Sequence, residues 1–359
     1  KAPEPTSGRC RLPNSTIHAP FSNVFLMIKN RFLLAILLPL CLLGCKTDDI
    51  FEGPSLNDLY GSFSLIYPFD IADRDVDFAQ GEQTFFTAQF SKNVEWKITI
   101  KGLESGSEKE ITGFSNSLTE SNTKWNGSTT HLPMFKAEVC AVELSFASEI
   151  DTFRDTLSVV SAKLNTGLLL SDFENGLNPG WNSFVQSGAN MTFQVKNVDI
   201  AAQGDLYYDM GGTVNWDWLI GLVNMPATAY GAKTYDLSPV ADNVFFNVML
   251  YKKPEINNAL ILFQFTEDDN GDGFYTANQE DMFSIEVSLT DPGWQQISSK
   301  YSDLATLING QPGTAIGNGL HEPDKLLQVS VLFLANPTSG YSQTYMDYLI
   351  FTENGPLQP

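Results

Sequence analysis

Basic residues are scarce in this chain of 359 residues, which has 21 lysines and arginines against 42 aspartates and glutamates. A formal net charge of -21 repels phosphate backbones, so nucleic-acid binding is not expected. Of the three histidines, only His131 and His321 follow residue 45, and neither lies beside a Ser or Cys in a nucleophile motif. The sequence also has no phosphate-cradling glycine loop and no paired-histidine zinc motif. A catalytic triad therefore has no support.

Cysteine is also rare. The four cysteines are Cys10, Cys41, Cys45 and Cys140, and their spacing fits neither a paired-thiol metal knuckle nor a disulfide framework. If Cys45 is acylated, Cys140 is the only thiol that remains after residue 45, so no intramolecular disulfide can form. Stability must then come from packing, with bound metal as a further source.

The remaining composition favours strands. Hydrophobic residues make up 43% of the chain, which is ample for buried cores, and the length exceeds that of a usual single domain. Charged residues are only 18%, whereas Gly 27, Pro 18, Tyr 12 and Phe 25 accompany many β-branched and small polar residues. We expect an all-β protein of two domains.

The N-terminal region has the pattern of an export signal. Residues 27–45 read MIKNRFLLAILLPLCLLGC, with positive charges at Lys29 and Arg31 and an apolar run over 32–43 that is too short to span a bilayer comfortably. The final tetrad, Leu-Leu-Gly-Cys, resembles the lipobox of bacterial lipoproteins. The resemblance implies that Cys45 is acylated and anchors the protein in a membrane. The alternative is a buried hydrophobic helix.

The flanks of this signal extend the prediction. Residues 1–26 are rich in Pro, Ser and Asn without a periodic pattern, and we interpret them as an upstream artefact of the gene call, with translation starting at Met27. Without residues 1–45 the chain has 16 basic and 41 acidic residues, a net charge of -25. The sequence KTDD that follows Cys45 looks like the export tag of lipoproteins sent to the outer face of Gram-negative outer membranes. We therefore expect a lipid-anchored protein on the cell surface. Two acids in a solvated linker are the alternative explanation.

The mature chain divides at two polar segments. Residues 46–59 have the composition of a linker. Clean alternation over 94–100 and 140–146 marks half-buried strands. About seven short strands fit into residues 60–163, the pattern of an immunoglobulin-like sandwich. Nothing in this domain gathers polar groups around a cleft, which favours a spacer.

After a link at 163–167, residues 168–353 form a second domain whose length suits a jelly-roll β-sandwich. Its expected strands are 191–195, 244–251, 259–266, 283–289 and 328–335. One short helix is expected, over 303–309, and Trp294 is assigned to the core at the start of a strand.

The two ends of this second domain carry a family resemblance. It opens with LSDFENG from Leu170 and closes with YMDYLIF from Tyr345. This pair resembles the galactose-binding-like jelly rolls that serve as carbohydrate-binding modules, in which an acidic residue in the opening strand and an Asp in the last strand hold a structural calcium ion. The resemblance implies that Glu174 and Asp347 are calcium ligands. First and last strands are adjacent in such a sandwich, and two inward carboxylates would repel without a cation between them. Two solvated carboxylates at strand edges are the alternative.

A second acidic cluster begins at residue 267 and reads EDDNGDG. It matches the first half of an EF-hand-like calcium loop. The candidate ligands are Asp268, Asn270, Asp272 and Glu280. Position twelve of the pattern is Gln279, so the bidentate carboxylate of Glu280 comes one residue late, and the flanking segments are strands. The segment is therefore either a calcium-binding hairpin loop or a turn rich in Asn, Asp and Gly.

Aromatic and polar residues suited to sugars cluster over residues 205–218, DLYYDMGGTVNWDW. The candidate ligand-binding residues are Tyr207, Tyr208, Asp209, Trp216, Trp218 and Tyr230. On a strand, Trp216 and Trp218 project to one face with Asp217 opposite. Exposed, the two indoles would form a stacking platform; buried, they would belong to the core. We expect one of the two to stack on sugar.

These observations predict a cell-surface lipoprotein that captures poly- or oligosaccharide without catalysis, with one or two structural calcium ions and with outer-membrane glycan-uptake proteins as partners. A glycoside hydrolase or lyase is the first alternative, because such an enzyme needs only two carboxylates about 5–9 Å apart. The candidates for that pair are Asp209, Asp217, Glu267 and Glu286. A protein-binding adhesin or structural surface protein is the second alternative.

Overall fold

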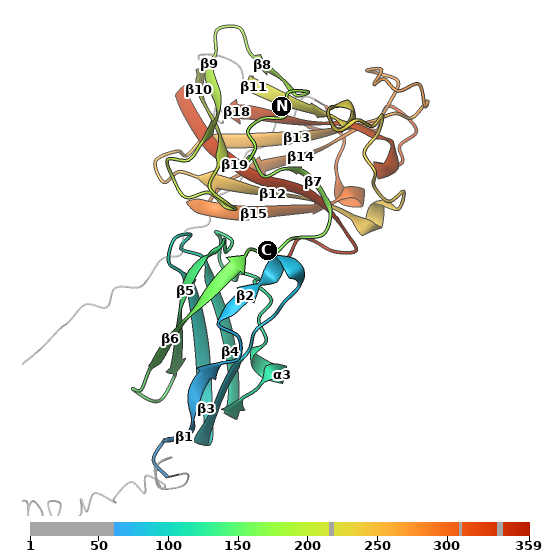
Figure 1. Ribbon diagram of the computed structural model, residues 1–359. Coiled ribbons are helices and arrows are strands. Elements are labelled where there is room, and N and C mark those ends of the chain that lie inside the picture. Colours follow the sequence, from blue (N-terminus) through green and yellow to red (C-terminus); the bar gives the residue numbers. More distant parts are fainter. Residues whose placement is uncertain (1–60, 215–218, 309–310, 336–339) are drawn as a thin grey trace, which may run out of the picture. The chain divides into compact units, whose positions relative to one another are not determined.

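The computed structural model describes residues 61–214, 219–308, 311–335 and 340–359. Their regular secondary structure is almost all β-strand, as the composition predicts (Figure 1). Trp216, Trp218 and the signal segment with Cys45 lie outside the described residues. Within the described part of the chain, no helix combines the length and the apolar character that crossing a lipid bilayer requires.

Six strands form the N-terminal sheet, in the order β1-β3-β5-β6-β2 with β4 paired to β3. These strands are β1 (Leu65–Ile71), β2 (Asp75–Asp77), β3 (Phe86–Gly102), β4 (Glu108–Leu118), β5 (Glu138–Phe146) and β6 (Phe153–Ser161). Two single turns of helix accompany them, η1 (Phe78–Gln80) and α3 (Glu120–Thr123).

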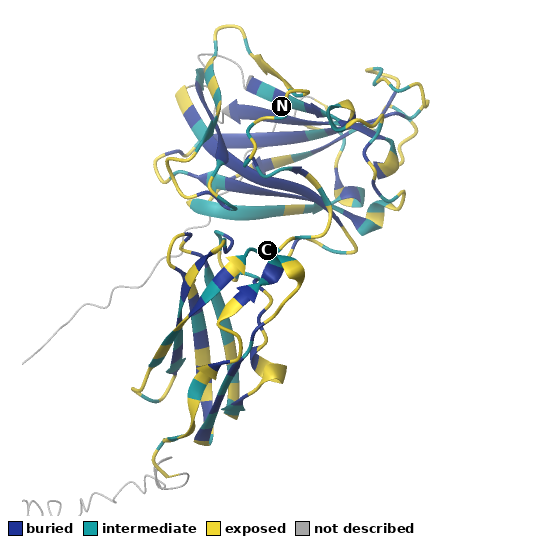
Figure 2. Ribbon diagram, viewed as in Figure 1, coloured by how far each residue is buried: buried dark blue, intermediate teal, exposed yellow. Residues whose placement is uncertain are grey.

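Alternation along β3 fixes which side of this sheet is buried. Val94, Trp96, Ile98 and Ile100 are all buried, whereas the residues between them face outward, as the period-two pattern predicts (Figure 2). They pack with Phe86 and neighbouring apolar residues into one core. All six strands belong to one hydrogen-bonded sheet, so the immunoglobulin-like assignment, which needs two sheets, is not confirmed.

Most of the remaining strands form two sheets that pack into a C-terminal β-sandwich, as the sequence predicts for residues 168–353. The β19 sheet has the order β15-β12-β19-β10-β9, with β7 also paired to β19, and the β18 sheet has the order β14-β13-β18-β11-β8. The strands are β7 (Leu168–Ser171), β8 (Asn182–Val185), β9 (Asn190–Lys196), β10 (Tyr207–Val214), β11 (Leu219–Pro226), β12 (Val244–Lys252), β13 (Ala259–Glu267), β14 (Met282–Ser288), β15 (Gly293–Lys300), β18 (Leu326–Ala335) and β19 (Gly340–Glu353). A small hairpin, β16 (Leu307–Ile308) and β17 (Gln311–Pro312), and the short helices η2 (Ala227–Tyr230), η3 (Ala241–Asn243), η4 (Tyr301–Asp303) and η5 (Pro323–Lys325) complete it.

The main core fills the space between these two sheets. Phe246 on β12 packs against Phe263 on β13 with ring centroids 5.0 Å apart, and against Phe351 on β19 at 5.3 Å. All three rings are fully buried. Burying a side chain of this size stabilises the fold by about 1.5–3 kcal/mol, so this layer of packed rings holds the two sheets together. The predicted apolar face of β14 joins the same core.

Two sequence expectations need correction. Of the helix expected over 303–309, the described residues 303–308 are not helical beyond Asp303, where η4 ends, and Ala305 exchanges both backbone hydrogen bonds with Ser284 in a sheet-like bridge. That pairing commits the segment to an extended backbone. Trp294 does begin a strand, β15, but it is only partly buried and lies outside the main core.

Candidate functional site

Side chains on the outer side of the β19 sheet form a row that crosses its strands. Met210 and Met346 point into the core, so their neighbours Asp209 and Tyr345 point outward. The register then aligns outward residues on four adjacent strands. The row runs Asp209 on β10, Tyr345 on β19, Tyr251 on β12 and Trp294 on β15, each paired with the next. We call these four residues the cross-strand row.

Aromatic rings are in continuous contact along this row. The centroids of Tyr345 and Tyr251 are 5.2 Å apart and the rings are stacked, and those of Tyr251 and Trp294 are 5.3 Å apart. Tyr207 packs on Tyr345 at 4.4 Å from the other side. Lys253 Nζ lies 5.1 Å from the centroid of the Tyr345 ring, within range of a cation–π contact.

Only part of this aromatic surface is accessible. Tyr207 and Tyr345 are buried, and their hydroxyls donate to Asp199 Oδ2 at 3.3 and 2.7 Å. Tyr251 and Trp294 are partly exposed. Tyr341, at the start of β19, is 51% exposed. The surfaces available for stacking are therefore those of Tyr251, Trp294 and Tyr341.

A polar group adjoins the aromatic surface at Asp209. Lys196 Nζ on β9 donates to Asp209 Oδ2 at 2.5 Å, and Gln343 Nε2 on β19 donates to Oδ1 at 2.8 Å. The hydrogen bond to Asp209 raises the pKa of Lys196. Gln343 and Tyr341 share a face, because they are two residues apart on one strand. The outer side of the β19 sheet thus combines hydrogen-bonding groups with accessible rings.

The predicted ligand-binding residues fare differently. Asp209 lies in the polar group of this surface, and Tyr207 is a buried ring that packs on Tyr345. Tyr208 is buried in the core and stacks on Phe173 with centroids 5.3 Å apart, so its ring is out of reach of a ligand. Tyr230 packs against the core, and its hydroxyl donates to the carbonyl of Leu170 at 2.9 Å, which is a structural contact. Trp216 and Trp218 lie outside the described residues.

Several residues of this surface were not among the predicted ligands. They are Lys196, Tyr251, Trp294, Tyr341, Gln343 and Tyr345. A signal was present for the last strand, because residues 341, 343 and 345 read Tyr, Gln, Tyr with period two and therefore share one face.

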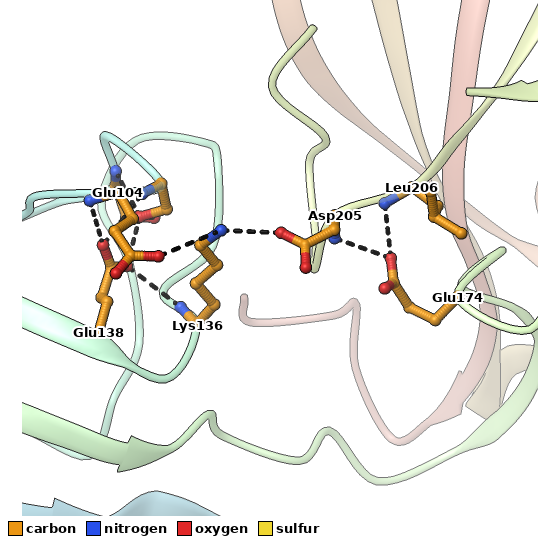
Figure 3. A network of polar contacts seen from close by, with 8 residues as sticks. Glu104, Lys136, Glu138, Glu174, Asp205 and Leu206 are labelled. Atoms are coloured by element: carbon orange, nitrogen blue, oxygen red, sulfur yellow. Dashed lines mark hydrogen bonds and ion pairs between the residues drawn. The ribbon is translucent and has the colours of Figure 1, made fainter. Parts of the chain in front are cut away.

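The predicted calcium ligands at the two ends of the sandwich come close together. β7 pairs with β19, with Ser171 opposite Leu349, so the first and last strands are adjacent as expected. Glu174 Oε1 accepts the backbone N–H groups of Asp205 and Leu206 at 2.9 and 2.8 Å, and Asp205 also forms an ion pair with Lys136 at 2.8 Å (Figure 3).

Asp347 is fully buried beside this carboxylate. Its Oδ2 accepts the N–H of Gln203 at 2.9 Å and its Oδ1 that of Tyr348 at 2.7 Å. Burial, together with the nearby Glu174 carboxylate, raises the pKa of Asp347 well above its usual value. The Oε1 atom of Gln203 is buried without a hydrogen-bond partner among the described residues. Calcium coordination by Glu174 and Asp347 stays a prediction.

The EF-hand-like loop also assembles part of its predicted set. Asp268, Asp272 and Glu280 each bring one carboxylate oxygen within 4.8 Å of the others. Glu280 therefore occupies the place that Gln279 would take in the standard spacing. The fourth residue, Asn270, accepts the N–H of Asp272 at 2.8 Å, and its own N–H lies 3.3 Å from Glu280 Oε1.

The carboxylates named for a hydrolytic pair do not converge. Asp209 lies on the β19 sheet, whereas Glu267 and Glu286 lie on strands of the β18 sheet. Asp217 lies outside the described residues. His321 stacks on Phe283 with centroids 3.8 Å apart and contacts the Leu304 carbonyl, a packing role. Among these described candidates, no pair shares one face of the protein.

Comparison with known proteins gives structural matches only. No family model matches the sequence, and no curated protein matches it. Among solved structures, the chain is similar to the family 11 carbohydrate-binding module of cellulase Lic26A-Cel5E from Clostridium thermocellum, with 16% identity, coverage of 54% of this chain and 97% of that one, and a TM-score of 0.37. It is similar to the CBM22-1 xylan-binding domain of Xyn10C from Paenibacillus barcinonensis, with 13% identity, coverage of 53% and 97%, and a TM-score of 0.31.

A third match is a carbohydrate-binding module of family 28, described as specific for non-crystalline cellulose, with 11% identity, coverage of 52% of this chain and 96% of that one, and a TM-score of 0.31. These neighbours are carbohydrate-binding modules. Because every one of these TM-scores lies below 0.5, we assign the fold from the strand order and argue the function from the site.

Proposed function

We propose that the C-terminal sandwich binds poly- or oligosaccharide on the outer side of its β19 sheet and captures it without catalysis. The observation that carries this proposal is the cross-strand row, in which Asp209 continues in register into Tyr345, Tyr251 and Trp294. Asp209 and Tyr345 are buried and support the row from below, whereas the partly exposed Tyr251 and Trp294, together with the exposed Tyr341 on the same sheet, offer rings to a chain of sugars.

This face of the β19 sheet suits both the apolar faces and the polar edges of a sugar ring. Pyranose rings present apolar C–H surfaces, and accessible rings such as Tyr251 and Tyr341 can bury them. Hydroxyl groups at the sugar edges need donors and acceptors at fixed positions, which the partly exposed Gln343 offers. Because the buried Asp209 accepts a hydrogen bond from Gln343 and holds it in place, less side-chain freedom is lost on binding.

The rest of the chain fits a surface protein in this proposal. Acylation at Cys45 would anchor the protein to the outer membrane on the cell surface, and the N-terminal sheet would act as a spacer. Calcium ions held by Glu174 and Asp347, and by the loop from Asp268 to Glu280, would brace the sandwich. Outer-membrane glycan-uptake proteins are the partners that would receive the captured sugar.

Substitution of the exposed rings tests the proposal. On a glycan array and by isothermal titration with the best ligand, Tyr251→Ala and Tyr341→Ala should each weaken binding about tenfold or more, the equivalent of ~1.4 kcal/mol. Tyr67→Ala is the matched control, because Tyr67 is a 64% exposed tyrosine of the N-terminal sheet and should leave affinity unchanged.

Three other outcomes would reject this assignment. If all three variants bind glycan as tightly as the unmodified protein, the outer side of the β19 sheet is not the binding site. Turnover of a polysaccharide by the purified protein would select a hydrolase or lyase. An array without hits, together with a protein captured in a pull-down, would select an adhesin.

The tryptophans outside the described residues remain a separate prediction. Trp216→Ala or Trp218→Ala should leave the protein folded and reduce glycan binding if that indole stacks on sugar. Loss of folding would instead place the indole in the core.

A further inference from the structure

A second acidic cluster lies next to the EF-hand-like loop and uses different residues. Glu267, Asp269 and Glu322 each place one carboxylate oxygen within 4.8 Å of the others. The first two flank Asp268, and the third comes from the segment before β18, at the N-cap of η5. The two carboxylate sets therefore share no residue, although both draw on the chain segment at the end of β13.

Two oxygen atoms in this cluster are buried without a hydrogen-bond partner among the described residues, Glu267 Oε2 and Asp269 Oδ1. Glu267 is 0% exposed. Its other oxygen is fully engaged, because Oε1 accepts the Tyr301 hydroxyl at 2.8 Å and the Glu322 N–H at 2.9 Å. The carboxylate is therefore held through Oε1, and Oε2 is left without a hydrogen-bond partner among the described residues.

The second orphan has the same arrangement. Asp269 Oδ2 accepts the N–H groups of Asp281 and Asn318 at 2.9 and 3.3 Å, which leaves Oδ1 unpartnered. The close approach is built into the backbone: a Cβ on Gly317 would lie 1.8 Å from Asp269 Oδ2. Glycine at that position lets the neighbouring loop reach this carboxylate.

The nearby lysine does not satisfy these atoms. Lys325 Nζ forms an ion pair with Glu322 Oε1 at 2.8 Å, and the other Glu322 oxygen accepts Asn318 Nδ2. Among the described residues, no ion pair reaches Glu267 or Asp269, and the ammonium group of Lys325 is engaged by Glu322 on the partly exposed rim. A buried acceptor without a hydrogen-bond partner lowers the stability of the fold by about 1–3 kcal/mol, and by more if the group is charged. A bound cation would remove this penalty for both oxygens.

We propose that Glu267, Asp269 and Glu322 bind a divalent cation, with calcium as the metal that fits best. All three donors are carboxylate oxygens, which hard cations prefer, and histidine and thiolate ligands are absent from the set. Backbone N–H groups already fix the non-coordinating oxygens of Glu267 and Asp269, so the free oxygens are preorganised. The cation joins the loop after β13 to the segment before β18.

Counting bound calcium tests this site independently of glycan binding. The purified protein is stripped with chelator, titrated with Ca²⁺ by calorimetry, and its bound calcium measured by atomic emission after gel filtration. Glu267→Gln and Glu322→Gln should each lower the stoichiometry by one ion relative to the unmodified protein. Asp272→Asn should remove a different ion, that of the EF-hand-like loop, so the double variant Glu322→Gln, Asp272→Asn should lose two.

The control is Glu286→Gln, an exposed glutamate on β14 outside the cluster, which should keep every ion. Near-ultraviolet circular dichroism confirms that each variant is folded, and Glu322→Gln provides a second route because its side chain is 23% exposed and tolerates exchange. An unchanged calcium count in both glutamine variants would overturn the proposal. Glycan affinity is measured in parallel, so a failed metal site and a failed sugar site give separate results.

Discussion

The Lys196 ammonium group lies 2.5 Å from Asp209 Oδ2, and the two side chains differ greatly in exposure, 33% for the lysine and 2% for the aspartate. The aspartate is thus a nearly buried charge whose counterion sits at the surface. Gln343 holds its second oxygen. This arrangement places a rigid acceptor at one end of the cross-strand row.

Removing the lysine should leave that carboxylate poorly compensated. We expect Lys196→Met to lower the free energy of unfolding by about 1–3 kcal/mol, because a buried charged acceptor loses its partner. Denaturant titration gives the value. Lys97→Met is the matched control: Lys97 pairs with Glu110 at 2.7 Å, but both side chains are substantially exposed, and such pairs contribute about 0–1 kcal/mol. An equal loss of unfolding free energy in Lys196→Met and Lys97→Met would show that the burial of Asp209 does not strengthen its ion pair.

Calcium at the ends of the sandwich should appear as a dependence of stability on chelation. We expect chelator to lower the melting temperature of the unmodified protein, because an ion that binds only the folded state stabilises it by about 2.7 kcal/mol at a hundredfold excess over Kd. Asp347→Ala should shrink this response, since the variant lacks the buried carboxylate beside Glu174.

Differential scanning calorimetry with and without chelator measures the difference. Glu255→Ala, a change at an exposed acid, should keep the full response. A response in Asp347→Ala as large as in the unmodified protein would exclude a metal role for that residue.

Period-two patterns predicted the strands well, for a local reason. Residues 94–100 alternate between apolar and polar because successive side chains point to opposite faces of the strand and only one face is buried. The expected strands at 191–195, 244–251 and 259–266 match β9, β12 and β13 to within a few residues. The helix expected at 303–309 failed because its backbone pairs with Ser284, a residue distant in sequence.

The candidate site depended on information that is not local. Tyr251, Trp294 and Tyr345 come together through the strand order and register of the β19 sheet, and a single strand pattern does not specify which strands are neighbours. The EF-hand-like loop shows an intermediate case. Its residues were identified from their spacing, and the extra residue before Glu280 is accommodated in a loop where Asn278 adopts φ 67°.

Cys140 provides a probe of unfolding. Its thiol is fully buried on β5, and burial, with the neighbouring Glu138 carboxylate, raises its pKa to about 12. The reactive form is the thiolate, and a raised pKa keeps the group protonated at pH 8. For residues 46–359, in which Cys140 is the only cysteine, we expect negligible reaction with a disulfide reagent in buffer and one equivalent in denaturant. The midpoint should coincide with the loss of near-ultraviolet circular dichroism. Rapid labelling of the native protein at pH 8 would show that Cys140 is accessible.

Gly211 on β10 tests the glycan-binding face with a small change. A Cβ there would lie 2.9 Å from the Tyr341 hydroxyl, the far end of an exposed side chain that can move. We expect Gly211→Ala to displace Tyr341 and weaken glycan binding. The free energy of unfolding should change by less than about 1 kcal/mol, since alanine is favoured over glycine in a strand.

The matched comparison is Gly221→Ala on β11, whose Cβ would lie 2.8 Å from the backbone carbonyl of Phe184. That clash has no flexible partner and should cost about 1–3 kcal/mol. If Gly211→Ala retains full affinity by calorimetry, Tyr341 does not contact the sugar.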